Sequence, residues 1–88
     1  MAAPVTLAEA RLFLRVEHDA EDELIQTLIE AARARVEGEV GLSLTSTSAA
    51  PLRLAILMLA LRAYERGERE MAIGPVEAWI APYREVRL

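Results

Sequence analysis

Side chains that could perform acid–base or metal chemistry gather in one short stretch, from Glu17 to Glu23. The stretch holds the only histidine of the chain, His18, among five acidic residues. Their oxygens could hold a hard cation, but the stretch lacks the glycine and the alternating ligand spacing of an EF-hand loop. Acidic residues are also favoured at the start of a helix, because the helix dipole attracts them. We therefore interpret the stretch as a helix start and expect no metal site.

No nucleophile or phosphate-binding motif is present. The sequence has no cysteine, and Ser43, Ser46 and Ser48 lie outside any Gly-x-Ser-x-Gly elbow and have no second histidine to act with. The four glycines stand apart, so they form no glycine-rich phosphate loop. We expect no catalytic residues and no cofactor, and predict that the chain is not an enzyme.

Three arginines form a short basic strip, because their spacing of four and three residues puts them on one side of a helix. They are Arg62, Arg66 and Arg69, with Glu65, Glu68 and Glu70 interleaved. The strip could contact another subunit or a phosphate. It could equally be a solvated helix end whose charges pair with one another.

Residue types that are enriched at binding hot spots gather near the C-terminus. They are Trp79, Tyr83 and Arg84, with Pro82 between them. The cluster could bind a partner, or it could fold back and cover the core of its own subunit. Residue type does not distinguish between the two possibilities. All four are candidate interface residues.

The elements that position these residues must be helical. The chain has 88 residues, room for one small domain, and 53% of them are hydrophobic, with alanine and leucine the commonest. Without cysteine there is no disulfide framework. The apolar excess must therefore be absorbed by a helical core, by a partner surface, or by both.

The pattern predicts an all-α small bundle in a single domain over residues 1–88, with helices at about 7–14, 20–40, 51–66 and 75–80. Thr6 and Glu9 form a capping box before the first helix. Asp19 is the expected N-cap of the second, a long amphipathic helix that Gly41 ends. Residues 42–50 are expected to form a loop, Ala81 and Pro82 to stop the last helical turn, and residues 81–88 to form an extended tail.

The helix expected at 51–66 is apolar on nearly all sides. From Leu52 to Tyr64 only Arg53 and Arg62 are charged. Such a helix is normally buried all round, which two partner helices cannot easily achieve in so short a chain. We expect it to be the centre of the domain, with its flanks contributing to contacts between subunits.

Charge and hydropathy argue against a nucleic-acid-coating module and against a membrane-spanning protein. The net charge is −4, with −5 over residues 1–50 and +1 over residues 51–88, whereas a generic nucleic-acid-coating module would be strongly basic. The longest apolar run, Leu54 to Leu61, is far shorter than the roughly 20 residues that cross a bilayer. The N-terminus has no signal-peptide pattern. We expect a soluble protein that is made inside the cell and has no membrane contact.

The ordered pattern resembles phage head–tail connector (adaptor) proteins of the HK97-type family. The resemblance rests on Val5-Thr6-Leu7-x-Glu9-Ala10, Asp19-x-Glu21-Asp22-x-Leu24-Ile25-x-x-Leu28-Ile29, Val36-Glu37, Gly41, Ala55-Ile56-Leu57-x-Leu59, Tyr64-Glu65-Arg66 and Ala81-Pro82-Tyr83-Arg84. The chain departs from the family at Trp79-Ile80, where paired leucines are usual, and in the short 42–50 connection.

The resemblance implies a structural virion protein without catalysis. Such proteins form a ring, commonly of twelve subunits, below the portal at the capsid vertex. The ring extends the DNA channel without binding DNA specifically and docks the next tail component, a stopper or tail-completion protein. Gene transfer agents derived from prophages use similar proteins. The expected location is the head–tail junction of a virion or phage-like particle, after synthesis in the bacterial cytoplasm.

Two other classes remain as alternatives. A small helical DNA-binding or DNA-packaging accessory protein is opposed by the acidic balance. A dimeric all-helical enzyme of the chorismate-mutase type needs a lysine in its usual arrangement, and this chain has none.

Overall fold

The computed structural model describes residues 3–67 and 71–84. Its elements are α1 (Leu7–Leu14), α2 (Asp22–Val40), α3 (Ala50–Arg66), a 3-10 turn η1 (Gly74–Val76), α4 (Glu77–Ile80) and a second 3-10 turn η2 (Ala81–Tyr83). The described residues contain no strand. The predicted all-α class is therefore confirmed.

The first helix begins and ends through its own local chemistry. The Thr6 hydroxyl accepts the Glu9 backbone N–H at 3.1 Å, and the Glu9 carboxylate accepts the Thr6 N–H at 3.0 Å. This reciprocal pair satisfies two backbone donors that the first turn leaves free. Arg15 ends the helix in the left-handed region (φ 60°), and its N–H bonds back to the carbonyl of Leu12.

The long helix α2 begins two residues later than the sequence predicts. Its N-cap is Glu21, which makes no side-chain capping bond. The expected N-cap, Asp19, lies in the preceding turn, where its backbone carbonyl accepts the Asp22 N–H at 3.2 Å. At the other end Gly41 adopts φ 75°, a left-handed conformation that glycine enters without steric cost.

The segment between α2 and α3 is held to α2 by a side-chain pair. Glu37 accepts the Leu44 N–H at 2.8 Å, while Arg33 donates to the Leu44 carbonyl at 3.0 Å and to the Glu37 carboxylate at 3.1 Å. The pair fixes the backbone of Leu44, whose side chain is buried in the core. An irregular segment thus contributes to the core although it has no regular backbone bonds.

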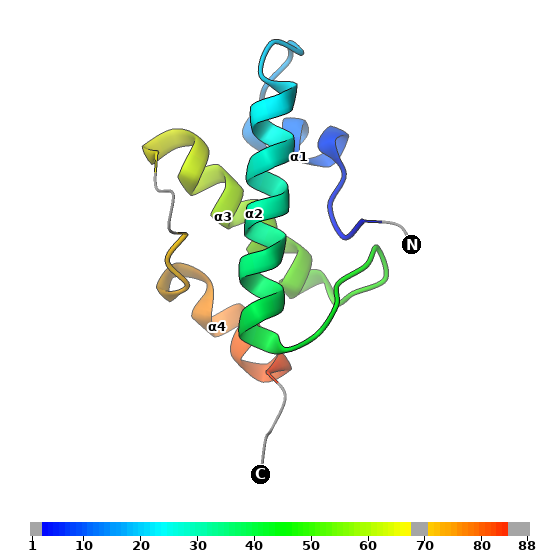
Figure 1. Ribbon diagram of the computed structural model, residues 1–88, viewed down its shortest axis with the longest axis vertical. Coiled ribbons are helices and arrows are strands. Elements are labelled where there is room, and N and C mark those ends of the chain that lie inside the picture. Colours follow the sequence, from blue (N-terminus) through cyan, green and yellow to red (C-terminus); the bar gives the residue numbers. More distant parts are fainter. Residues whose placement is uncertain (1–2, 68–70, 85–88) are drawn as a thin grey trace.

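Helix α3 crosses behind α2 in Figure 1 and packs against α2, α1, α4 and η1. One side of it is buried: Leu52, Ala55, Ile56, Leu59, Ala60 and Ala63. The opposite side is not covered within the single chain: Leu54 is 39% exposed and Leu57, Met58 and Leu61 are only half-buried. That this side contacts other subunits stays a prediction. An eight-residue α1 is too short to cover the remaining side.

The C-terminal part departs from the expected extended tail. After α4 the chain continues as η2 through Ala81, Pro82 and Tyr83, and only Arg84 is extended. Pro82 sits in the first turn of η2, a position that needs no backbone N–H. Residues 85–88 of the expected tail lie outside the described residues. Figure 1 shows this end of the chain packed beside the last turns of α2.

Candidate interaction surfaces

The arginine strip lies at the end of α3. Arg62 is half-buried and Arg66 is exposed, while Arg69 lies outside the described residues. Gly67 closes the helix in the left-handed region, and its N–H bonds to the Ala63 carbonyl at 2.9 Å. Arg66 is thus in the last turn, where the helix dipole favours a cation. The local geometry explains why a cation is placed here, and the role of the strip in an interface stays a prediction.

The C-terminal cluster divides into two kinds of residue. Trp79 and Tyr83 are half-buried and pack against the core, whereas Pro82 is exposed. The Arg84 guanidinium donates to both oxygens of Glu77, at 2.7 Å for Nη2 to Oε2, and to Oε1 of Glu39 at 3.2 Å. Arg84 therefore joins η2 to α4 and α2 within the subunit. Whether these residues also bind another protein stays a prediction.

The charge pairing at Arg84 affects the titration of its partner. The hydrogen bond from Arg84 lowers the pKa of Glu77 below its ordinary value, and the attraction of the guanidinium acts in the same direction. The same hydrogen bond, which the Glu77 carboxylate accepts, raises the pKa of Arg84. The ion pair thus keeps both groups charged across the neutral range.

A second cross-link joins α3 to the start of α2. The Tyr64 hydroxyl donates to Oε1 of Glu21 at 2.6 Å. This bond raises the pKa of Tyr64, with smaller contributions in the same direction from desolvation and from the Glu21 charge. Tyr64 and Glu21 are 43 positions apart in the sequence, so no local spacing signals the contact.

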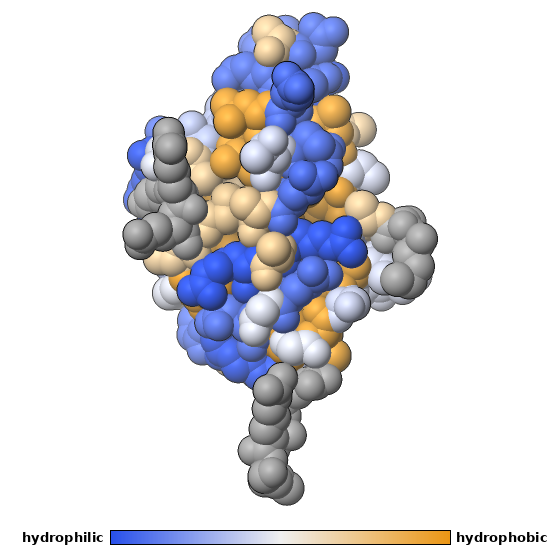
Figure 2. Space-filling model, in the orientation of Figure 1, coloured by the Kyte–Doolittle hydropathy of each residue, from blue (hydrophilic) through white to orange (hydrophobic). Residues whose placement is uncertain are grey.

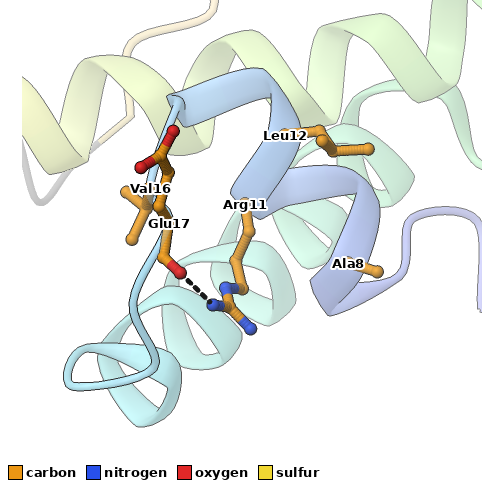
Figure 3. Close-up of a pocket in the computed structure, with 5 residues that line it drawn as sticks. All are labelled: Ala8, Arg11, Leu12, Val16 and Glu17. Atoms are coloured by element: carbon orange, nitrogen blue, oxygen red, sulfur yellow. Dashed lines mark hydrogen bonds between the residues drawn. The ribbon is translucent and has the colours of Figure 1, made fainter.

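A shallow hollow lies beside α1. It has a volume of about 340 Å³ and is lined by Ala8, Arg11, Leu12, Val16 and Glu17. Figure 3 shows the Arg11 guanidinium turned toward the Glu17 backbone, whose carbonyl accepts its hydrogen bond at 3.2 Å. Arg11 Nε also lies 3.6 Å from Asp22 Oδ1. Leu12 is 81% exposed, the largest exposure among the large hydrophobic residues described.

The remaining open surface consists of the outer sides of α3 and α2. On α3, Leu54, Leu57, Met58 and Leu61 recur every three or four residues, which puts them on one side of the helix. We call them the α3 ridge. On α2, the side opposite the core consists of small exposed residues: Thr27, Ala31, Ala34 and Gly38. We call these the α2 track; Figure 2 shows pale and tan residues running along α2 between hydrophilic blue ones.

The described residues show no arrangement suited to metal chemistry. Over residues 3–67 and 71–84, no three His, Asp or Glu side chains are grouped so as to hold a metal ion. His18 is exposed in the turn before α2. Among the helices of the described part, none is long and apolar enough to span a membrane. Contact surfaces are therefore the features of this subunit that call for a functional explanation.

An aliphatic helix face that is partly open to solvent is a common feature of proteins that contact other proteins. A family model, that of the phage gp6-like head–tail connector protein, matches residues 4–77. The match spans most of the chain, and the chain belongs to this family of structural phage proteins. Comparison with curated proteins and with solved structures gave no match.

The matched range includes α1, α2 and α3 and ends at Glu77. Of the motifs that carried the resemblance, all those from Val5 to Arg66 lie inside it. The terminal Ala81-Pro82-Tyr83-Arg84 lies beyond it. The ridge, the track and the arginines of α3 therefore belong to the family region, whereas Pro82, Tyr83 and Arg84 do not.

Proposed function

We propose that this chain is the subunit of a connector ring that lies below the portal at the head–tail junction of a virion or phage-like particle. The ring extends the DNA channel and docks the next tail component, a stopper or tail-completion protein. The observation that carries the proposal is the family match over residues 4–77. Twelve subunits, the number common in such rings, is the copy number we expect.

The surface of the subunit supports a role in assembly. The α3 ridge leaves aliphatic side chains uncovered, among them Leu54 at 39% exposure. Burying such apolar surface against a partner stabilises the complex by about 25 cal/mol for each Å² removed from water. Burial against neighbouring subunits is therefore the simplest use for the ridge.

The charge of the subunit supports a conduit rather than a DNA-binding protein. The chain carries a net charge of −4. Affinity for the phosphate backbone comes mainly from lysine and arginine contacts that release counterions. An acidic ring repels the passing phosphates on average, so DNA can move through it without being retained.

Loss of the chain tests the proposal in the particle itself. Removing its coding sequence from the phage or phage-like element should leave DNA-filled heads that carry a portal but no tail, visible by negative-stain electron microscopy. Supplying the chain from a plasmid should restore tailed particles. Normal tailed particles in its absence would contradict the proposed function.

A further inference from the structure

We propose that the segment between α2 and α3 lines the DNA channel of the connector ring, where the passing duplex slides along it without being retained. We call this segment, residues 41–49, the α2–α3 loop. The inference rests on the proposed function and names the part of the chain that faces the DNA. Three properties of the loop support it: the loop is uncharged, its composition is unlike that of a protein-binding surface, and it is held rigidly.

The α2–α3 loop is uncharged in a chain in which 27% of the residues are charged. It lies within Val40 to Leu52, the longest stretch of the sequence without a charged residue. Affinity for DNA comes mainly from lysine and arginine contacts that release counterions, whereas carboxylates close to the phosphates repel them. A surface that carries neither kind of charge lets a duplex come close and does not hold it.

The composition of the loop differs from that of a surface that binds another protein. Its exposed residues are Gly41, Leu42, Ser43, Ser46 and Thr47. The centres of protein interfaces are enriched in aromatic residues, methionine and arginine and are depleted in serine and alanine. The loop has three serines and an alanine, and it has no aromatic residue, methionine or arginine. This composition favours contact with the passing duplex over contact with a protein.

Side chains of both flanking helices hold the loop in one shape. Leu44 is 1% exposed and anchors the middle of the loop in the core, while Glu37 and Arg33 bond its backbone N–H and carbonyl. At the other end, Arg53 Nε donates to the Ser48 carbonyl at 3.2 Å. The three charged side chains are half-buried, and Arg33 and Glu37 neutralise each other as an ion pair. A loop anchored in this way keeps its position while DNA moves past it.

Hydrogen bonds within the loop occupy several of its hydroxyl groups. Ser48 Oγ accepts the Thr45 N–H at 2.9 Å, and the hydroxyls of Thr45 and Thr47 bond each other at 3.0 Å. Hydroxyls that bond within the loop are less available to phosphate oxygens. Figure 1 shows the loop projecting sideways from the end of α2, on the side away from α4. The loop therefore extends from the helices as a stiff surface with little capacity to bind phosphate.

Adding positive charge to the loop tests the assignment. Ser43 and Ser46 are exposed and make none of the hydrogen bonds described above, so Ser43→Lys/Ser46→Lys should fold and assemble on the purified portal. Its lysines should then face the channel and retain a linear duplex at least about tenfold more tightly than the wild-type complex, with an affinity that falls steeply with salt. Ser46→Lys alone repeats the test if the double variant does not fold.

The shape of the DNA distinguishes binding inside the channel from binding outside it. Only a duplex with a free end can thread through a ring, so a closed circle of the same sequence should show no comparable gain. The matched control is Thr27→Lys/Ala31→Lys, which adds the same charge on the exposed side of α2. The control complex should bind the linear and the circular duplex alike.

The outcomes separate this inference from the proposed function. Equal binding of linear and circular duplex by the assembled loop variant would overturn the inference, because the lysines would then lie on an outer surface. A loop variant that keeps the circular dichroism of the wild type but does not assemble on the portal would place the loop in a protein contact, which also overturns it. If the wild-type chain does not assemble on the portal, the proposed function itself fails.

Discussion

The hydroxyl of Tyr64 donates a 2.6 Å hydrogen bond to the carboxylate of Glu21, and so joins the last turn of α3 to the N-cap of α2. Both residues lie in the range that the family model matches. The contact fixes the relative position of the two longest helices of the chain. The bond therefore helps to set the shape of the surface that these helices present.

Titration of the tyrosines should reveal this bond. Because the bond and the Glu21 charge raise the pKa of Tyr64 above 10.0, its ionisation should appear above pH 10 in the tyrosinate absorbance. The component should disappear in Tyr64→Phe, persist in Tyr83→Phe and move to lower pH in Glu21→Gln. Since the folded pKa lies above the unfolded one, the stabilisation is complete below pH 10 and is lost as the pH rises through the folded pKa. A Glu21→Gln titration identical to that of the wild type would contradict the assignment.

Substitutions at two positions on α3 should change the free energy of unfolding by clearly different amounts. Ile56 is completely buried and Leu54 is 39% exposed. Removing one methyl group in Ile56→Val should lower the free energy of unfolding by about 1 kcal/mol. Leu54→Ala removes more atoms but should cost less, because water already reaches this side chain. Urea denaturation of the two variants measures both values, and the reverse order would show that the ridge belongs to the core of the subunit.

The pair that holds Leu44 should contribute to stability. In Glu37→Ala the Leu44 N–H loses its acceptor and Arg33 loses its carboxylate partner, so the free energy of unfolding should fall by about 1–3 kcal/mol. Glu30→Ala, on the exposed side of the same helix, should change it by less than about 0.5 kcal/mol. Equal effects in thermal or urea unfolding would mean that the loop is not held by this pair.

The C-terminal cluster should act in assembly rather than in folding. We expect Tyr83→Ala/Arg84→Ala to fold, with the circular dichroism of the wild type, but to bind the portal or neighbouring subunits less well. Because Tyr83 packs against the core and Arg84 pairs with Glu77 and Glu39, we expect the folded variant to be somewhat less stable than the wild type. Loss of folding in the double variant would instead show that the cluster serves to cover the core.

The all-α class can be predicted from the sequence because the signals that begin and end the helices are local. The capping box of Thr6 and Glu9 spans three residues, and glycines end α2 and α3 at Gly41 and Gly67. The start of α2 was misplaced for a local reason too. Asp19 has the side chain of an N-cap, but its backbone carbonyl closes a turn with Asp22 instead. Residue type alone does not decide between two such uses of one aspartate.

Long-range contacts could not be predicted from local spacing. The link between Arg33 and Glu37 follows from their spacing of four, but their hold on Leu44 depends on how the chain returns after Gly41. The pairing of Arg84 with Glu39 spans 45 positions. Apolar composition likewise shows that α3 can bury most of its surface, but it does not show which side the other helices of the chain cover and which side they leave open.

The most direct test of the connector assignment is size-exclusion chromatography with light scattering, run on the chain alone and with the purified portal from the same phage or phage-like element. The account predicts that the chain co-elutes with the portal and adds the mass of a ring, about twelve copies by the family resemblance. A chain that elutes separately and leaves the mass of the portal unchanged would contradict it.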